Sequence, residues 1–153
     1  MKVTLKVPMK TGKTETRGKK ISEKRIVDVL ISYLRYNNHV KREVRHYEKI
    51  IDVVAMPLKG DELCTIEVKT QNWKKAFRQA FVNLAVADRS YVAMYSKYAH
   101  RVDTEILREY GIGLYSVGSA WGNVELLEEA NLSRYTNRIT NQRIKEQIIG
   151  DNK

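Results

Sequence analysis

The chain of 153 residues carries 28 Lys and Arg against 18 Asp and Glu, which is a formal net charge of +10, and 42% of its residues are hydrophobic. This length and composition suit one folded domain with a substantial core and exclude a disordered tail. No apolar run approaches the roughly 18 residues of a membrane span, and residues 1–20 show no signal-peptide pattern. One cysteine, Cys64, excludes a disulfide framework and a cysteine-based zinc site. We therefore expect a cytoplasmic (intracellular) protein that does not associate with membranes.

The excess positive charge lies at the two ends of the chain. Residues 1–25 hold nine basic and two acidic side chains, residues 131–153 hold five and two, and residues 26–130 hold fourteen of each. Basic ends around a neutral body favour an anionic partner, most simply a nucleic acid, although basic tails can also be merely solvated. We expect a basic arm or edge strand over residues 1–20, a core over 21–130, and a basic C-terminal helix or arm over 131–153.

The first half of the chain predicts a helix followed by three strands. Ser22 is a suitable N-cap, Glu23 favours the helix dipole, and apolar residues recur at helical spacing until Asn37 and Asn38. From residue 39 the pattern alternates with a period of two, which places Val40 and Val44 on one side of a strand. Two further strands over 50–56 and 63–69 flank turn residues 57–62, so all three form an antiparallel meander.

The second half alternates strands with helices. Asn72 can cap a helix over 73–86, a strand follows over 90–95, and a short helix over 103–110 ends at Gly111. The next strand spans 112–117, a last short strand is indicated over 124–127, and residues 134–149 have near-helical spacing. This order favours parallel pairing in the second half. The fold class is therefore α/β, with a central mixed five-stranded sheet flanked by helices.

Two of these strands carry acidic residues where burial makes them costly. Asp52 lies within an otherwise apolar strand, and Glu67 lies between two apolar residues and is followed by Lys69. Glu67 and Lys69 share one strand face, and a turn near residues 59–60 places Asp52 opposite Glu67. Two such carboxylates suit Mg²⁺ or Mn²⁺, and a nearby lysine can hold water or phosphate. The alternative is a Glu67–Lys69 surface ion pair with Asp52 at a sheet edge.

These residues resemble the motif of the PD-(D/E)XK nucleases, the restriction-endonuclease-like superfamily. The resemblance covers about residues 21–118 and rests on the element order, on Ile51-Asp52 and on Glu67-Val68-Lys69. Ile51 stands where the family usually has proline. The resemblance implies a restriction-endonuclease-like core in which Asp52, Glu67 and the carbonyl of Val68 hold a divalent metal, while Lys69 orients the hydrolytic water.

The resemblance also suggests helical contributors to the site. Glu23 matches the glutamate that many members add from the first helix, and Gln79 matches a polar residue on the helix after the motif. Each has a plain alternative, because Glu23 also suits the helix dipole and Gln79 also suits a solvated helix face. For nucleic-acid contacts the candidates beside the site are Gln71 and Lys75. The candidates in the basic N-terminal segment are Lys10, Lys13, Arg17, Lys19 and Lys20.

The sequence thus predicts a metal-dependent nuclease that hydrolyses phosphodiester bonds in DNA. A structure-specific enzyme of a repair or recombination type is one form that the resemblance allows, and the sequence does not choose a DNA structure. Its DNA partner is duplex, single-stranded or branched, and a homodimer is plausible because such DNA presents two strands. The main alternative is a non-catalytic nucleic-acid-binding module on the same fold. A third is a structural protein whose acids are held in ion pairs.

Overall fold

The computed structural model describes residues 20–151, so the predicted arm lies outside the described residues except for Lys20. The elements in chain order are α2 (Glu23–Leu34), β1 (Asn38–His46), β2 (Lys49–Pro57), β3 (Cys64–Lys69), α3 (Trp73–Asn83), β4 (Arg89–Tyr95), the 3-10 helix η1 (Ala99–Arg101), α4 (Thr104–Tyr110), β5 (Gly113–Val117), β6 (Val124–Glu128) and α5 (Arg138–Asp151). Within this range no helix combines the length and apolar character that crossing a bilayer requires.

One mixed sheet organises the fold, with its strands side by side in the order of the sequence. The predicted antiparallel meander β1–β2–β3 is confirmed, as is the parallel pairing of β3 with β4 and of β4 with β5. The predicted count of five strands is wrong, because β6 adds a sixth, antiparallel to β5. This edge strand, which is mostly exposed, coincides with the short strand indicated over 124–127, which the predicted five-stranded sheet left out.

Side-chain caps begin the helices where the sequence predicts them. The hydroxyl of Ser22 accepts a hydrogen bond from the Arg25 amide at 3.0 Å, and the Asn72 side chain accepts one from the Lys75 amide at 3.1 Å. Gly111 ends α4 with φ of 72°, a left-handed conformation that glycine adopts without strain. Both α2 and α3 end before the predicted positions, because the residues that follow them form turns.

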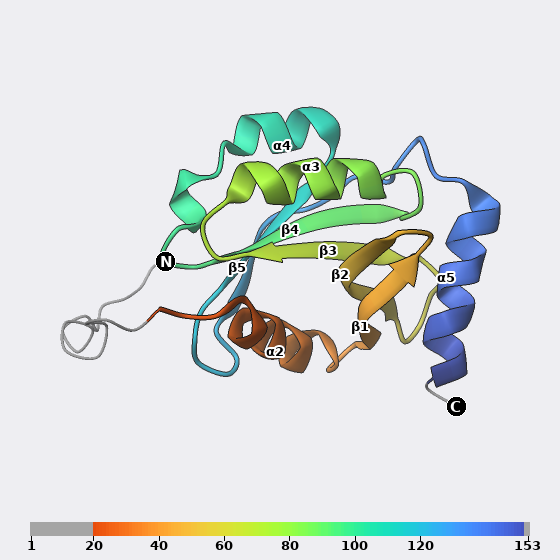
Figure 1. The fold of residues 1–153 in the computed structure, drawn as a ribbon, viewed down its shortest axis with the longest axis horizontal. Coiled ribbons are helices and arrows are strands. Elements are labelled where there is room, and N and C mark those ends of the chain that lie inside the picture. Colours follow the sequence, from red (N-terminus) through yellow and green to blue (C-terminus); the bar gives the residue numbers. More distant parts are fainter. Residues whose placement is uncertain (1–19, 152–153) are drawn as a thin grey trace.

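Helices cover both faces of the sheet (Figure 1). On one face, Ile26 and Leu30 of α2 belong to a buried cluster with Ile66 and Val68 of β3. The even-numbered residues of β3 therefore face this cluster, on the side opposite to the face that Glu67 and Lys69 share. On the other face, α3 and α4 cover β4 and β5, and Leu107 of α4 is fully buried there.

The β1–β2 hairpin departs from the predicted alternation. Glu43, within β1, has φ of 54°, which is rare for a residue other than glycine. Val40 belongs to the cluster beneath α2, whereas Val44 belongs to a separate cluster that includes Ile144 of α5. The prediction that Val40 and Val44 share one side of a regular strand is therefore wrong. The change at Glu43 lets the hairpin serve α2 at one end and α5 at the other (Figure 1).

A buried carboxylate ties α5 to the sheet. Asp88, just before β4, accepts a hydrogen bond from the Leu63 amide at 2.7 Å and lies 3.5 Å from the ammonium nitrogen of Lys145. Arg138 and Asn141 of α5 reach the same carboxylate at 3.0 and 3.3 Å. Burial opposes ionisation of Asp88, but these donors outweigh it and hold its pKa below the ordinary value. The C-terminal helix is thus anchored by charge as well as by apolar packing.

Candidate metal centre on strands β2 and β3

The β2–β3 register brings Asp52 and Glu67 together. Val53 pairs with Ile66, so Asp52 and Glu67 occupy the next opposed positions, where the ladder of backbone pairs ends. There the Asp52 carboxylate accepts a hydrogen bond from the Val68 amide at 2.9 Å. This bond holds the carboxylate beside β3 in place of the regular backbone pairing. The hairpin therefore positions both acids through the backbone, as their spacing predicts.

Glu67 is the most deeply buried acid of this group, with 2% of its surface exposed. One of its carboxylate oxygens accepts a hydrogen bond from the Asn83 side chain at 2.8 Å, and the other has no partner among the described residues. Burial, with the negative charge of Asp52 adding to it, raises the pKa of Glu67 to about 8, although Asn83 and Lys69 act in the opposite direction. The positive charge of Lys69 therefore does not offset burial and the charge of Asp52, and a bound cation would add to it.

Lys69 connects the strand to the first helix. Its ammonium nitrogen lies 3.7 Å from a carboxylate oxygen of Glu23, and its positive charge also acts on Glu67. The side chain of Lys69 is 16% exposed, whereas that of Glu23 is 47% exposed. The structure therefore brings Glu23 to the edge of the site through Lys69. Glu23 is thus connected to the site by its ion pair with Lys69 and not by a contact with Asp52 or Glu67.

Helix α3 contributes two side chains on one face, since Gln79 and Asn83 are four residues apart. Both line a cavity of about 180 Å³ beside Glu67, and its lining residues are Lys49, Ile50, Glu67, Gln79, Val82 and Asn83. The side-chain oxygen of Gln79 is buried without a hydrogen-bond partner among the described residues. Gln79 and Glu67, each with one unpartnered buried oxygen, thus line the same small cavity. Such a pair requires a donor or a cation.

Sequence reasoning missed Asn83 and Lys49. Asn83 is 5% exposed and makes the one hydrogen bond to Glu67 described above. Its spacing from Gln79, one helical turn on, was the available signal. Lys49 begins β2 and lines the cavity, which no local pattern indicates.

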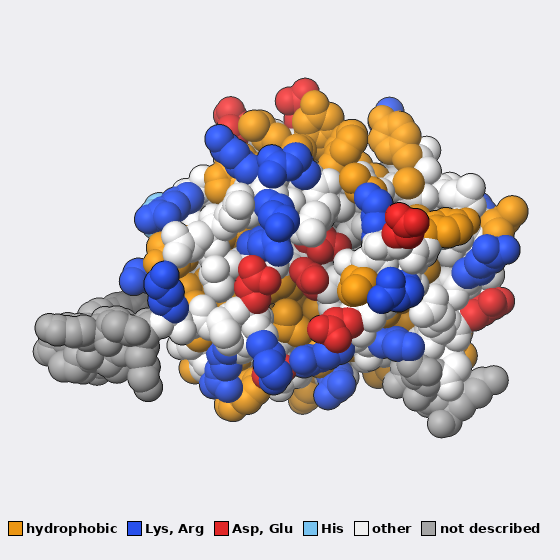
Figure 2. Space-filling view, in the orientation of Figure 1, with side chains coloured by type: hydrophobic (Ala, Val, Ile, Leu, Met, Phe, Trp, Pro, Cys, Tyr) orange, Lys and Arg blue, Asp and Glu red, His pale blue; other side chains and the backbone are white. Residues whose placement is uncertain are grey.

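The remaining predicted contacts lie toward the surface. Gln71 is exposed in the bend between β3 and α3, and Lys75 is exposed in the first turn of α3. Lys20 is exposed at the start of the described range, whereas Lys10, Lys13, Arg17 and Lys19 lie outside it. Figure 2 shows one face of the molecule, with acidic side chains near its middle and Lys and Arg side chains around them. Such a ring of positive charge suits a polyanion that crosses the face.

The donor set fits a hard divalent cation. Within residues 20–151 no group of three or more His, Cys, Asp or Glu side chains is arranged to hold a metal. Asp52 and Glu67 offer two carboxylates, and the unpartnered oxygen of Glu67 is available to bind a cation. Mg²⁺ is commonly held by one or two carboxylates, with waters and substrate phosphates completing its shell.

Burial raises the pKa of the Cys64 thiol to about 12, which fits a core residue rather than a nucleophile.

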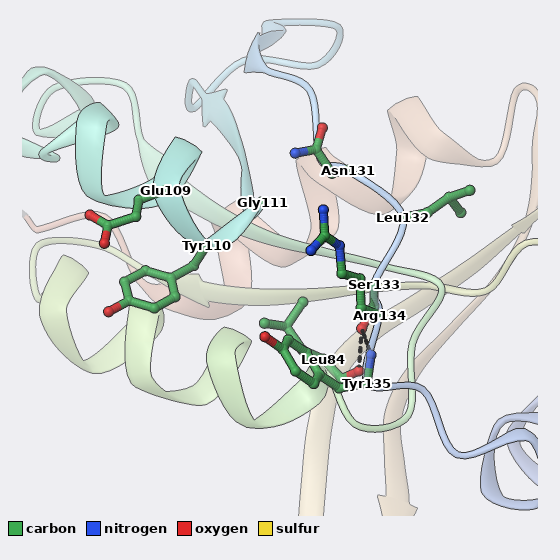
Figure 3. A pocket seen from close by; sticks show the side chains of 9 residues that line it. All are labelled: Leu84, Glu109, Tyr110, Gly111, Asn131, Leu132, Ser133, Arg134 and Tyr135. Carbon is green, nitrogen blue, oxygen red and sulfur yellow. Dashed lines mark hydrogen bonds between the residues drawn. The ribbon is translucent and has the colours of Figure 1, made fainter.

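A second cavity, of about 360 Å³, lies apart from these residues (Figure 3). It opens between the ends of α3 and α4 and the segment 131–135. The Ser133 hydroxyl donates to the Leu84 carbonyl at 2.6 Å and accepts from the Tyr135 amide at 3.1 Å. None of its lining residues belongs to the predicted site, and Glu109 is its single carboxylate.

Comparison with known proteins supports the fold. None of the known protein-family models matches the sequence, and no curated protein sequence matches it. The chain is similar in structure to a protein of unknown function from Silicibacter pomeroyi, with a TM-score of 0.67 and 18% identity over 87% of each chain. That likeness extends over nearly the whole domain and shows a shared fold.

Two further solved structures are more distant. A repair endonuclease from Pyrococcus abyssi matches with a TM-score of 0.47 and 13% identity, over 67% of this chain and 49% of the other. SfsA from Pyrococcus furiosus, in complex with Ca²⁺, matches with a TM-score of 0.36 and 15% identity, over 75% and 62%. TM-scores below 0.5 reflect limited shared geometry, so neither match assigns an activity to this chain.

Proposed function

We propose that the protein is a divalent-metal-dependent nuclease that hydrolyses phosphodiester bonds in DNA. The observation that carries the proposal is the buried Glu67, opposed to Asp52 and left with one unpartnered carboxylate oxygen. A buried glutamate beside a half-buried aspartate is costly unless a cation joins them, which favours a metal site over a purely structural one. The excess of basic residues favours a polyanionic substrate.

Different side chains have different roles in the proposed reaction. Asp52, Glu67 and the carbonyl of Val68 would hold Mg²⁺ or Mn²⁺, which supplies Lewis-acid stabilisation of the phosphate charge and acidifies water. Asn83 positions Glu67 by binding one oxygen and leaving the other free. Lys69, held toward Glu23, places a positive charge beside the carboxylates, where it orients the attacking water and offsets charge on the phosphate.

A cleavage assay tests this assignment. Labelled duplex, single-stranded and branched DNA are incubated with the protein and Mg²⁺, Mn²⁺ or EDTA, beside Asp52→Asn, Glu67→Gln and Lys69→Ala. We expect metal-dependent cleavage that each substitution reduces by at least about 100-fold while DNA binding persists. Asp61→Asn, which alters an exposed loop carboxylate, is the matched control and should cleave as the wild type does.

The alternative, a non-catalytic DNA-binding module on the same fold, gives a different result. It predicts salt-sensitive binding with no cleavage of any substrate in either metal. Undiminished cleavage by Glu67→Gln would reject the site assignment, and cleavage in EDTA would reject the role of the metal.

A further inference from the structure

A second surface, on the outer side of α2, carries aromatic and basic side chains that the proposed metal centre does not use. The β5–β6 loop lies beside α2 there (Figure 1). The guanidinium of Arg25 donates two hydrogen bonds to the Ser119 carbonyl, at 3.0 and 2.8 Å, and lies 4.4 Å from the centre of the Trp121 ring. Trp121 remains 59% exposed. The loop is thus tied to the helix and holds an exposed indole in place.

The indole forms one wall of a cavity of about 380 Å³. The cavity is lined by Asp28, Ile31, Ser32, Arg35, Arg42 and Trp121. Its single carboxylate, Asp28, is already paired with Arg42 and, at 3.0 Å, with Lys24. These hydrogen bonds hold the pKa of Asp28 below its ordinary value. The cavity therefore has a net positive lining against an aromatic wall.

A neighbouring cavity of about 440 Å³ extends this surface along α2. The two adjoin, because both are lined by Ser32 and because Gly122 follows Trp121. The second is rich in aromatic rings and amides, with Tyr33, Tyr36, Tyr115, Asn37 and Asn38 in its lining. Tyr36 is 87% exposed and Tyr33 is 43% exposed, so their rings are open to a ligand. Together the two cavities form what we call the α2 groove.

We propose that the α2 groove binds unpaired nucleotides of a single DNA strand. Exposed aromatic rings near guanidinium groups are the means by which proteins hold single strands, since bases stack on the rings and phosphates meet the positive charges. Trp121 and Tyr36 provide the stacking surfaces, and Arg35, which is not paired with Asp28, provides the charge. An acidic peptide could use the arginines, but it would leave the rings without a partner, so the ring content favours nucleotides.

The inference rests on the proposed function in one respect, namely that the polyanion is DNA. It narrows the substrate class to DNA with a single-stranded segment, such as a flap, gap or branched end. Bases within a continuous duplex are stacked on one another, so their faces cannot meet Trp121 or Tyr36. The groove would therefore distinguish a single-stranded segment from blunt duplex before any bond is cut.

Binding can be measured apart from cleavage by working in EDTA. The fluorescence anisotropy of a labelled twelve-nucleotide oligo(dT) gives the Kd for the full chain and for Trp121→Ala, Tyr36→Ala and Arg35→Ala. A stacked base contributes enough that losing one ring should weaken binding by about 5- to 150-fold. Trp121→Phe should keep most of the affinity, and Arg35→Ala should lower the slope of log Kd against log salt by about 0.7.

Tyr135→Ala is the matched control, because Tyr135 is 70% exposed but lies outside the groove, beside the cavity of Figure 3. It should bind oligo(dT) as the wild type does. Thermal melting of each variant confirms that the fold is kept, and Tyr36, being the more exposed ring, tests the groove without disturbing the Arg25–Trp121 contact.

Two results would overturn the inference. One is wild-type affinity for oligo(dT) in both Trp121→Ala and Tyr36→Ala, and the other is equally strong competition by a blunt duplex. Neither result affects the metal centre, which the cleavage assay judges separately. Conversely, weakened oligo(dT) binding in these variants, in a protein that cuts no DNA with any metal, would support the groove and reject the proposed nuclease.

Discussion

Replacing Glu67 by glutamine is expected to stabilise the metal-free protein at neutral and alkaline pH. Glutamine keeps the shape of the side chain and can still accept the hydrogen bond from Asn83, but it removes a charge that is buried beside Asp52. The wild-type protein must ionise Glu67 in this setting as the pH rises, whereas the variant has nothing to ionise.

The sign and size follow from the pKa of Glu67 in the two states. Its ordinary value is 4.5 and its value in the folded protein is about 8. Because the folded state holds the proton more tightly, the contribution of Glu67 to the free energy of unfolding is highest below pH 4.5, falls as the pH rises, and levels off above pH 8. At 1.36 kcal/mol for each pH unit, the loss is about 3 kcal/mol at pH 7 and about 5 kcal/mol above pH 8.

Urea denaturation in EDTA at pH 4.5, 7 and 8.5 measures this difference. Glu67→Gln should match the wild type within about 1 kcal/mol at pH 4.5 and exceed it by about 3 kcal/mol at pH 7. Glu48→Gln, in the exposed β1–β2 turn, is the matched control and should differ from the wild type by less than about 0.5 kcal/mol throughout. A stability difference that does not change with pH would refute the reasoning, as would a variant less stable than the wild type at pH 8.5.

Three other outcomes are expected. Mg²⁺ at ten times its Kd should stabilise the wild type at pH 8 by about 1.4 kcal/mol in a thermal-shift titration, but should leave Asp52→Asn and Glu67→Gln unchanged; an equal shift in all three proteins would contradict the metal centre. Asn83→Ala should cost about 1–3 kcal/mol in urea denaturation because it removes a buried hydrogen bond, and should raise the Kd for Mg²⁺ by calorimetry; unaltered metal affinity would remove Asn83 as a positioning residue. Asp88→Ala should cost about 3–5 kcal/mol because it leaves Lys145 buried without its partner, and hydrogen exchange should show α5 opening first; uniform loss of protection across the fold would argue against that anchor.

Local patterns were sufficient for much of the fold and for the strand acids. Side-chain caps at Ser22 and Asn72 act within one helical turn, so the sequence predicts them directly. The facing of Glu67 follows from the two-residue period of a strand, and the position of Asp52 follows from the length of the hairpin. Each of these rules involves neighbouring residues or a single turn, so it predicts local structure without information on the rest of the chain.

Other features depend on contacts between distant segments. The positive φ of Glu43 lies where β1 turns from α2 toward α5. Strand β6 forms by pairing with the edge of β5. The cavity beside Glu67 requires α3 to lie over β3, so that Asn83 reaches its carboxylate. No sequence period encodes these approaches, since they are set by how whole elements pack.

The sequence by itself therefore determined which residues we propose for the chemistry: a strand aspartate, a strand glutamate and a lysine two residues on. Tertiary structure decided how they are surrounded. It buried Glu67, left one of its oxygens unpartnered, and set Glu23 against Lys69. It also brought the β5–β6 loop onto α2, which places Trp121 over Arg25. The physical reason is that strand and helix periods decide which way a side chain points, whereas burial and pKa depend on what packs against it.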